Sequence, residues 1–234
     1  MRTPGSKGAR EMKKALTFLW ENYIATILLV NLVLGVLVFW TNYLMPQQHF
    51  FAVYLMMYPL FPVFFLLIYG YNLSALWQNM ALSFQCRRHD YFWAGQVAFL
   101  VTGVGCALIT VAMGALYVNV LDISSMVVGS PFLENGIPWA RPGAIPPMAV
   151  LALCFQPIGA ALGAIYEKHK ILTTVILIFI MLLGVAGTSM SLFMAEWGIV
   201  IAGPVLSGVC AVFVVLALVG EAVYYRSVQT AVVR

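Results

Sequence analysis

The sequence predicts an all-α, polytopic membrane protein with six transmembrane helices. Hydrophobic residues make up 63% of the 234 residues and charged residues 9%, whereas soluble globular proteins have roughly 45–50% and about 25%. Long segments without any Asp, Glu, Lys or Arg separate small clusters of charge. Because too few charges are present to cover a water-soluble core, the composition excludes a cytosolic enzyme, a nucleic-acid-binding domain and a disordered chain.

Five uncharged runs provide the six spans, because a helix needs about 20 apolar residues to cross a bilayer. The run at 22–86 is long enough for two crossings, and the polar, Pro-containing segment at 45–49 allows a hairpin between them. Each of the other four runs fits one crossing. The predicted spans are 24–44, 50–71, 93–118, 147–166, 171–193 and 199–224. Their continuous apolar runs do not alternate as the strands of a transmembrane β-barrel do.

Residues 10–23 predict an amphipathic helix before the first span. At 100° per residue its apolar face consists of Met12, Leu16, Leu19, Trp20 and Tyr23, and its polar face of Lys13, Lys14, Thr17 and Glu21. The helix either lies in the cytoplasmic membrane interface, with the chain then turning into the span, or extends the span into water. We favour the interfacial helix, because the apolar face is compact and Trp and Tyr suit the headgroup level.

The distribution of Lys and Arg predicts the topology. Six spans place both termini on one side, and every basic residue except Arg141 then falls on that side. The positive-inside rule makes this side cytoplasmic, as expected for a multi-pass protein of the cell membrane. The chain thus divides into a cytoplasmic N-terminus with the amphipathic helix (1–23), a transmembrane domain (24–225) and a cytoplasmic tail (226–234).

The cytoplasmic loop at 72–91 is longer than a simple turn requires. Asn72 or Ser74 can cap a helix whose apolar stripe is Leu76, Met80 and Phe84. A cluster of charge follows at 85–90. Its arginines either anchor the end of a span or belong to a short helix that docks on a cytoplasmic partner through charge-assisted hydrogen bonds.

The segment at 80–92, MALSFQCRRHDYF, favours docking because it resembles a motif in permease subunits of ATP-binding-cassette (ABC) exporters of the second export-type class. That motif runs apolar-Ser-apolar-Gly-x-x-Arg-x-x-aromatic-aromatic between the second and third spans. The matching residues are Ser83, Phe84, Arg87, Arg88, Tyr91 and Phe92. Gln85 departs from the pattern, since it stands where the family usually has Gly.

The resemblance implies an N-terminal elbow helix, six spans and a coupling helix after the second span. It also implies a partner: a cytosolic ABC ATPase that carries ATP and Mg²⁺, so this chain is non-catalytic and holds no cofactor. A second permease subunit, identical or related, completes the membrane part. The implied ATPase-docking residues are Trp77, Phe84, Gln85, Arg87, Arg88, His89 and Asp90.

The external loop at 119–146 is rich in Pro and Gly, which preclude a long helix. It either folds onto the outer mouth of the bundle or serves as a linker. The family resemblance further implies a re-entrant hairpin around 188–202.

No phosphate loop, zinc-protease motif or pair of intramembrane histidines occurs in the sequence. The four cysteines have neither the positions of a structural disulfide nor the spacing of a metal site. No ionisable residue falls in the middle of a predicted span, so an ion-driven transporter is disfavoured. The polar residues in or near the spans are expected to form hydrogen bonds between helices: Asn31, Asn42, Gln96 and Gln156.

These observations predict a permease subunit that exports a hydrophobic or amphipathic cargo such as a peptide, lipid or drug. The alternative is a non-transporting membrane protein, an immunity or sensor subunit that binds a ligand at its external loop. The cytoplasmic loop favours the exporter, because an immunity protein needs no ATPase dock.

Overall fold

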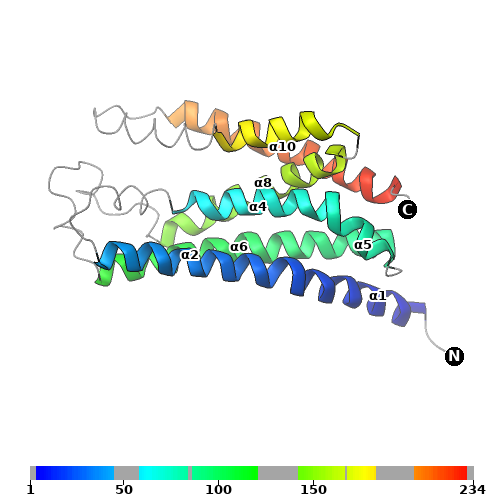
Figure 1. Ribbon diagram of the computed structural model, residues 1–234, viewed down its shortest axis with the longest axis horizontal. Helices are drawn as coiled ribbons and strands as arrows, with labels where there is room; N and C mark the ends of the chain where they lie inside the picture. The colour runs from blue at the N-terminus through cyan, green and yellow to red at the C-terminus, as the bar shows by residue number, and fades with distance from the viewer. Residues whose placement is uncertain are drawn as a thin grey trace.

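A computed structural model describes residues 4–44, 58–83, 86–120, 142–166, 168–182 and 203–230. Every regular element among these residues is a helix, and the described ranges contain no strand. The helices run along one common direction and form an elongated bundle (Figure 1). The all-α prediction is confirmed.

The bundle contains long α-helices joined by shorter π- and 3₁₀-helical segments. Its elements are α1 (Pro4–Leu19), η1 (Trp20–Ile24), α2 (Ala25–Leu44), α4 (Leu60–Asn72), η2 (Leu73–Trp77), α5 (Gln78–Ser83), α6 (Arg88–Val120), η4 (Pro142–Ala144), α8 (Ile145–Tyr166), a helix at Lys170–Leu182, and α10 (Gly203–Thr230).

Among the described residues, five helices are long and apolar enough to cross a membrane. They are Met12–Thr41, Leu60–Leu82, Arg88–Val120, Pro142–Tyr166 and Ala211–Thr230. The helix at Lys170–Leu182 is apolar but shorter, and the rest of the span predicted at 171–193 lies outside the described residues. Five of the six predicted spans therefore have a matching helix among the described residues, and the span at 171–193 stays a prediction.

The N-terminal amphipathic helix is present, but the turn expected of an elbow is absent from the described backbone between Pro4 and Leu44. The backbone at Leu19 (φ −71°, ψ −30°) and at Ala25 (φ −61°, ψ −42°) is right-handed helical, and α1 continues directly into α2 along one edge of the bundle (Figure 1). The sequence from 9 to 34 contains no Gly or Pro to break the helix. The structure has the alternative arrangement, an extension of the first span.

The two faces of this extension are distributed largely as predicted. Lys13, Lys14, Thr17 and Glu21 are exposed, whereas Leu19 and Tyr23 are fully buried. The buried face packs against α6. The apolar stripe thus covers another helix, and only Trp20, which is 54% exposed, points away from the bundle.

The expected coupling helix is likewise continuous with the second span. Asn72 has helical angles (φ −63°, ψ −31°) and makes no side-chain cap, so α4, η2 and α5 form one helix from Leu60 to Leu82. Only residues 84–87 separate α5 from α6, and of these 84 and 85 lie outside the described residues. The predicted helix exists, but as the end of a span and without a cap at its start.

Glycines allow α4 and α8 to cross closely. A Cβ atom on Gly159 would lie 2.0 Å from the carbonyl oxygen of Leu67, and one on Gly163 would lie 2.1 Å from that of Tyr71. On the facing helix, a Cβ on Gly70 would lie 2.3 Å from the carbonyl oxygen of Gln156. The Gly159-x-x-x-Gly163 spacing places both glycines on one helix face, which allows the two backbones to touch.

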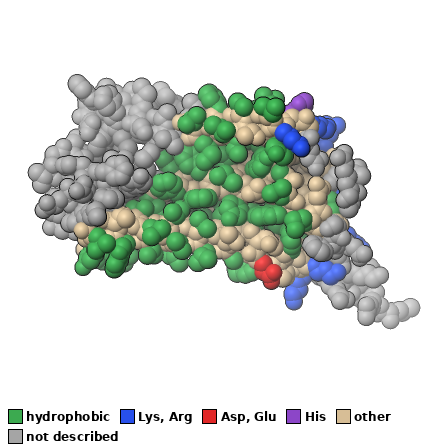
Figure 2. Space-filling model, in the orientation of Figure 1, with side chains coloured by type: hydrophobic (Ala, Val, Ile, Leu, Met, Phe, Trp, Pro, Cys, Tyr) green, Lys and Arg blue, Asp and Glu red, His purple; other side chains and the backbone are tan. Residues whose placement is uncertain are grey.

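Basic side chains gather at the end of the bundle where both chain termini lie, and hydrophobic side chains cover most of its length (Figure 2). The described basic residues from residue 13 onward are Lys13, Lys14, Arg87, Arg88, Lys168, Lys170 and Arg226. We call this the basic end. The grouping of basic residues expected from the sequence is present among these residues. Residues 121–141, which include Arg141 and most of the predicted external loop at 119–146, lie outside the described residues. The side of the membrane that the basic end faces stays a prediction.

Candidate functional site

The predicted docking residues lie at the basic end, around the junction of α5 and α6. Arg87, Arg88 and His89 are exposed, and Asp90 is partly buried. Phe84 and Gln85 lie outside the described residues. The charged residues of the predicted site are therefore described at the basic end, whereas Phe84, its main apolar residue, is not.

The two neighbouring arginines have different roles. An Nη1 of Arg88 donates to the backbone oxygen of Gln229 over 2.8 Å, which ties the start of α6 to the last turn of α10. This bond satisfies a carbonyl that a helix end otherwise leaves open. Arg87 instead precedes α6, and its backbone oxygen accepts a hydrogen bond from the backbone N–H of Tyr91 over 2.9 Å. Within the described part of the chain, the guanidinium of Arg87 has no hydrogen bond or ion pair, so it is the arginine available to a partner.

His89 and Asp90 form part of the first turn of α6. The indole Nε1 of Trp93 donates to Nε2 of His89 over 3.0 Å, and Nδ1 of His89 lies 3.7 Å from an oxygen of Asp90. A carboxylate in this position interacts favourably with the N-terminal end of the helix dipole. Asp90 thus stabilises the start of α6, and its exposed neighbour His89 is the more accessible of the two.

The inner face of α5 and η2 is used for packing. Trp77 is half-buried, and its ring contacts Tyr23 at 5.7 Å and Tyr69 at 5.8 Å between centroids. Gln78 is buried and donates to the backbone oxygen of Ser227 over 3.3 Å. Trp77 therefore packs inside the bundle with part of its ring.

The outer face of the same segment is apolar and open. Leu76 is 56% exposed and Met80 is 50% exposed. These two residues belong to the stripe that the sequence predicted. We call Leu76, Met80, Arg87 and His89 the end surface: two apolar side chains and two polar ones, all exposed at the basic end.

A buried polar cluster lies deeper in the bundle, around Gln156 of α8. Its Oε1 accepts the hydroxyl of Tyr23 over 2.6 Å and that of Thr102 over 2.8 Å. Its Nε2 donates to the backbone oxygens of Phe99 over 2.9 Å and of Ala152 over 3.3 Å. All donors and acceptors of this amide are engaged, so Gln156 joins three helices and has no capacity left for a ligand.

A second cluster centres on Asn31 of α2. Its Nδ2 donates to the backbone oxygen of Cys106 over 3.2 Å, and the hydroxyl of Tyr58 donates to its Oδ1 over 3.1 Å. The predicted interhelical role is confirmed for Asn31 and Gln156. The side chain of Asn42 lies outside the described residues.

The fourth predicted residue, Gln96 of α6, has an ionisable partner. Its Nε2 donates to Oε1 of Glu221 in α10, and both side chains are partly buried. The last uncharged run in the sequence ends at Gly220, which placed Glu221 at the edge of the predicted span. Because α10 continues to Thr230, Glu221 instead lies inside the candidate span Ala211–Thr230. The structure thus places a partly buried carboxylate in this candidate span, five residues before Arg226.

The described residues contain no group of three or more His, Cys, Asp or Glu side chains that could hold a metal ion. Cys86, Cys106 and Cys154 are each buried. Among the residues that sequence reasoning missed, Gly159 and Gly163 had a visible pattern, the Gly-x-x-x-Gly spacing. Tyr23, Thr102 and Glu221 had none that identified their partners.

No protein-family profile matches the chain, and neither a curated protein nor a solved structure matches it.

Proposed function

We propose that this chain is the membrane-spanning permease subunit of an ABC exporter, which moves a hydrophobic or amphipathic cargo out of the cell. The single observation that carries the proposal is the position of Arg87. Arg87 lies within the segment that resembles the motif, next to Arg88 at the motif's Arg position. It is at the basic end and presents an exposed guanidinium without a partner among the described residues.

The end surface has the chemistry that a protein partner requires. Exposed Leu76 and Met80 offer apolar contact, and Arg87 offers a charge-assisted hydrogen bond to a carboxylate. Arginine is enriched at protein interfaces, and its planar guanidinium suits bidentate pairing. A cytosolic ATPase with an acidic rim around an apolar groove would complement this surface. That partner would supply ATP binding and hydrolysis with Mg²⁺.

The helix continuity supports a direct path for force. Since α4, η2 and α5 form one helix, a displacement of the end surface would move the whole second span. The glycine contacts of Gly159 and Gly163 bind that span closely to α8. ATP-driven closure of the partner would therefore tilt α4 and α8 together, as rigid bodies in an alternation between inward and outward states. A second permease subunit would provide the opposite wall of the cargo path.

The proposal is tested by purifying the chain with its cognate ATPase in mild detergent and comparing two variants. Arg87→Ala removes the unpaired cation of the end surface, whereas Lys168→Ala removes an exposed cation at the same end on another segment. We expect Arg87→Ala to reduce recovered ATPase at least about tenfold, as for loss of a charged contact at an interface, and Lys168→Ala to have little effect.

Two outcomes would contradict the docking proposal. One is full recovery of the ATPase with Arg87→Ala, and the other is equal loss with Lys168→Ala, which would indicate a diffuse effect of charge. A wild-type chain that purifies alone, without any ATPase, would favour a non-transporting immunity or sensor protein.

A further inference from the structure

The contact between α6 and α10 carries a carboxylate on a surface that is otherwise apolar and aromatic. Trp93, Gln96 and Leu100 follow one another at helical spacing on α6, and Leu218, Glu221 and Tyr225 do so on α10. We call these six residues the α6–α10 seam. The hydrogen bond from Gln96 to Glu221 joins the two rows.

Glu221 has no basic partner among the described residues. Its only hydrogen bond there comes from the neutral amide of Gln96, and it takes part in no ion pair. Arg226 follows five residues later, about 7.5 Å further along the helix axis. Arg88 precedes Gln96 by eight residues, about 12 Å. The negative charge therefore lies deeper in the bundle than the basic residues and is not neutralised by them.

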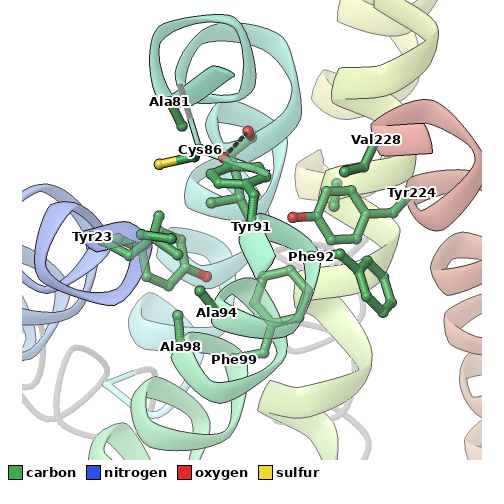
Figure 3. Close-up of a cluster of buried hydrophobic side chains, with 14 of the residues drawn as sticks. Tyr23, Ala81, Cys86, Tyr91, Phe92, Ala94, Ala98, Phe99, Tyr224 and Val228 are labelled. Atoms are coloured by element: carbon green, nitrogen blue, oxygen red, sulfur yellow. Dashed lines mark hydrogen bonds between the residues drawn. The ribbon is translucent and has the colours of Figure 1, made fainter. Parts of the chain in front are cut away.

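Aromatic residues lie about one turn from Gln96 and Glu221, on the side nearer the basic end. Trp93 is 49% exposed and Tyr225 is 47% exposed, one on each helix of the seam. Phe92 packs between the helices, with ring centroids 5.0 Å from Tyr225 and 5.6 Å from Tyr224. Figure 3 shows Phe92 and Tyr224 facing each other between α6 and α10. Aromatic faces next to a carboxylate are the environment that attracts an ammonium group.

The deeper side of the seam is aliphatic. Leu100 lies one turn beyond Gln96, away from the basic end, and is 58% exposed. Leu218 lies one turn beyond Glu221 in the same direction, because α10 runs antiparallel to α6, and it is 67% exposed. An alkyl chain lying along these leucines would place its polar head at Glu221.

We propose that the α6–α10 seam binds a positively charged amphiphile, an alkyl chain with an ammonium head, with the head at Glu221 and the chain along Leu100 and Leu218. An unneutralised carboxylate in a membrane span is costly and marks a functional position, and a cation is the ligand that offsets its charge. Anionic and neutral amphiphiles lack this complementarity. As a statement about cargo, the inference rests on the proposed export function, whereas binding itself needs no ATPase.

Binding is tested on the full chain in phosphatidylcholine nanodiscs, without ATPase. The probe is a dodecyl chain that carries a trimethylammonium head and a diazirine for photo-crosslinking, and mass spectrometry locates the labelled peptides. We expect labelling of α6 and α10 near the seam, with competition by unlabelled dodecyltrimethylammonium and none by dodecyl sulfate or dodecyl maltoside. Glu221→Gln should weaken labelling at least about tenfold, while Glu221→Asp, which keeps the charge, should stay within about threefold of wild type.

Glu21→Gln is the matched control, because Glu21 is an exposed carboxylate near the basic end but outside the seam. Its labelling should equal that of wild type. Equal labelling by anionic and cationic probes of wild type, or full labelling of Glu221→Gln, would overturn the inference. If Glu221→Gln does not fold, the inference is tested by comparing the cationic, anionic and neutral amphiphiles on the wild-type chain. A chain that binds the cation but recovers no ATPase would refute the export function and leave the site standing.

Discussion

The hydroxyl of Tyr23 donates to Oε1 of Gln156 over 2.6 Å, although the two residues are 133 positions apart in the chain. Tyr23 belongs to η1, at the base of the first span, and Gln156 lies in the middle of α8. The bond therefore fixes the rotation of the N-terminal helix relative to the centre of the bundle.

Removing the Tyr23 hydroxyl and removing the Gln156 amide are expected to lower the free energy of unfolding by different amounts. Tyr23→Phe leaves Oε1 of Gln156 bonded to Thr102, so unfolding should become easier by only about 0.6 kcal/mol, the average for hydrogen bonds between membrane helices. Gln156→Leu leaves the buried Tyr23 hydroxyl without its acceptor and should cost about 1–3 kcal/mol. Unfolding in detergent with increasing SDS measures both. Tyr225→Phe, at an exposed ring, should leave the free energy of unfolding unchanged. An equal effect of all three variants would contradict the hydrogen-bonded cluster around Gln156.

The crossing of α4 and α8 is expected to tolerate no side chain at its glycines. Gly159→Ala would place a Cβ atom 2.0 Å from the Leu67 oxygen, so the backbones must move apart, at a cost of about 1–3 kcal/mol as for overpacking of a core. Gly143→Ala is the control, because nothing lies within 4 Å of its Cβ position. Thermal unfolding in detergent separates the two variants. Equal stability would show that α4 and α8 do not touch there.

The N-terminal helix is expected to be straight through residue 24. Spin labels at Lys13→Cys and Thr41→Cys would be about 42 Å apart along one continuous helix, whereas a right-angled elbow at residue 24 would bring them to about 30 Å. Double electron–electron resonance in nanodiscs distinguishes these distances. Labels at Leu100→Cys and Val118→Cys, within α6, should give about 27 Å and calibrate the measurement. A distance near 30 Å for the first pair would restore the interfacial elbow.

Arg88 is expected to act inside the chain, in contrast to Arg87. Arg88→Ala removes the bond to the Gln229 oxygen, so the last turn of α10 should fray. Hydrogen exchange of the amides at 227–230 should speed up several-fold, while global stability changes by less than about 1 kcal/mol, because exposed contacts contribute little. Arg87→Ala should leave exchange in that turn unchanged. Faster exchange with both variants would mean that the two arginines share one role.

The sequence pattern predicted the helices well and their junctions poorly. Uncharged runs located the spans, because the length of apolar chain that crosses a bilayer is fixed by bilayer thickness. The amphipathic pattern around Lys13 and Leu19 separated exposed from buried residues. It could not tell whether a membrane surface or α6 would cover the buried face, since both are apolar. The pairing of Gln96 with Glu221 depends on how two distant helices pack, which local spacing does not contain.

For the candidate site, local sequence placed Arg87 in the charge cluster and Leu76 in the apolar stripe, and both side chains are exposed. It assigned Arg88 and Trp77 to the same surface because motif similarity does not distinguish side chains that face outward from those that meet α10 or Tyr23. Gly159 and Gly163 were visible as a spacing, but their partner Leu67 was not.

The π-helical segment η1 also determines the helical phase of the first span. Along the first span and its N-terminal extension, buried residues recur every four positions: Ala15, Leu19, Tyr23, Ile27, Asn31 and Gly35. In a pure α-helix each such step drifts by about 40°, so the six would spread over about 200°. The extra residue in the wide turn at Trp20–Ile24 returns about 100° of that drift. Deleting exposed Asn22 would rotate the basic half of the helix by about 100° relative to the other half, turning Ala15 and Leu19 away from α6 without changing a single buried side chain.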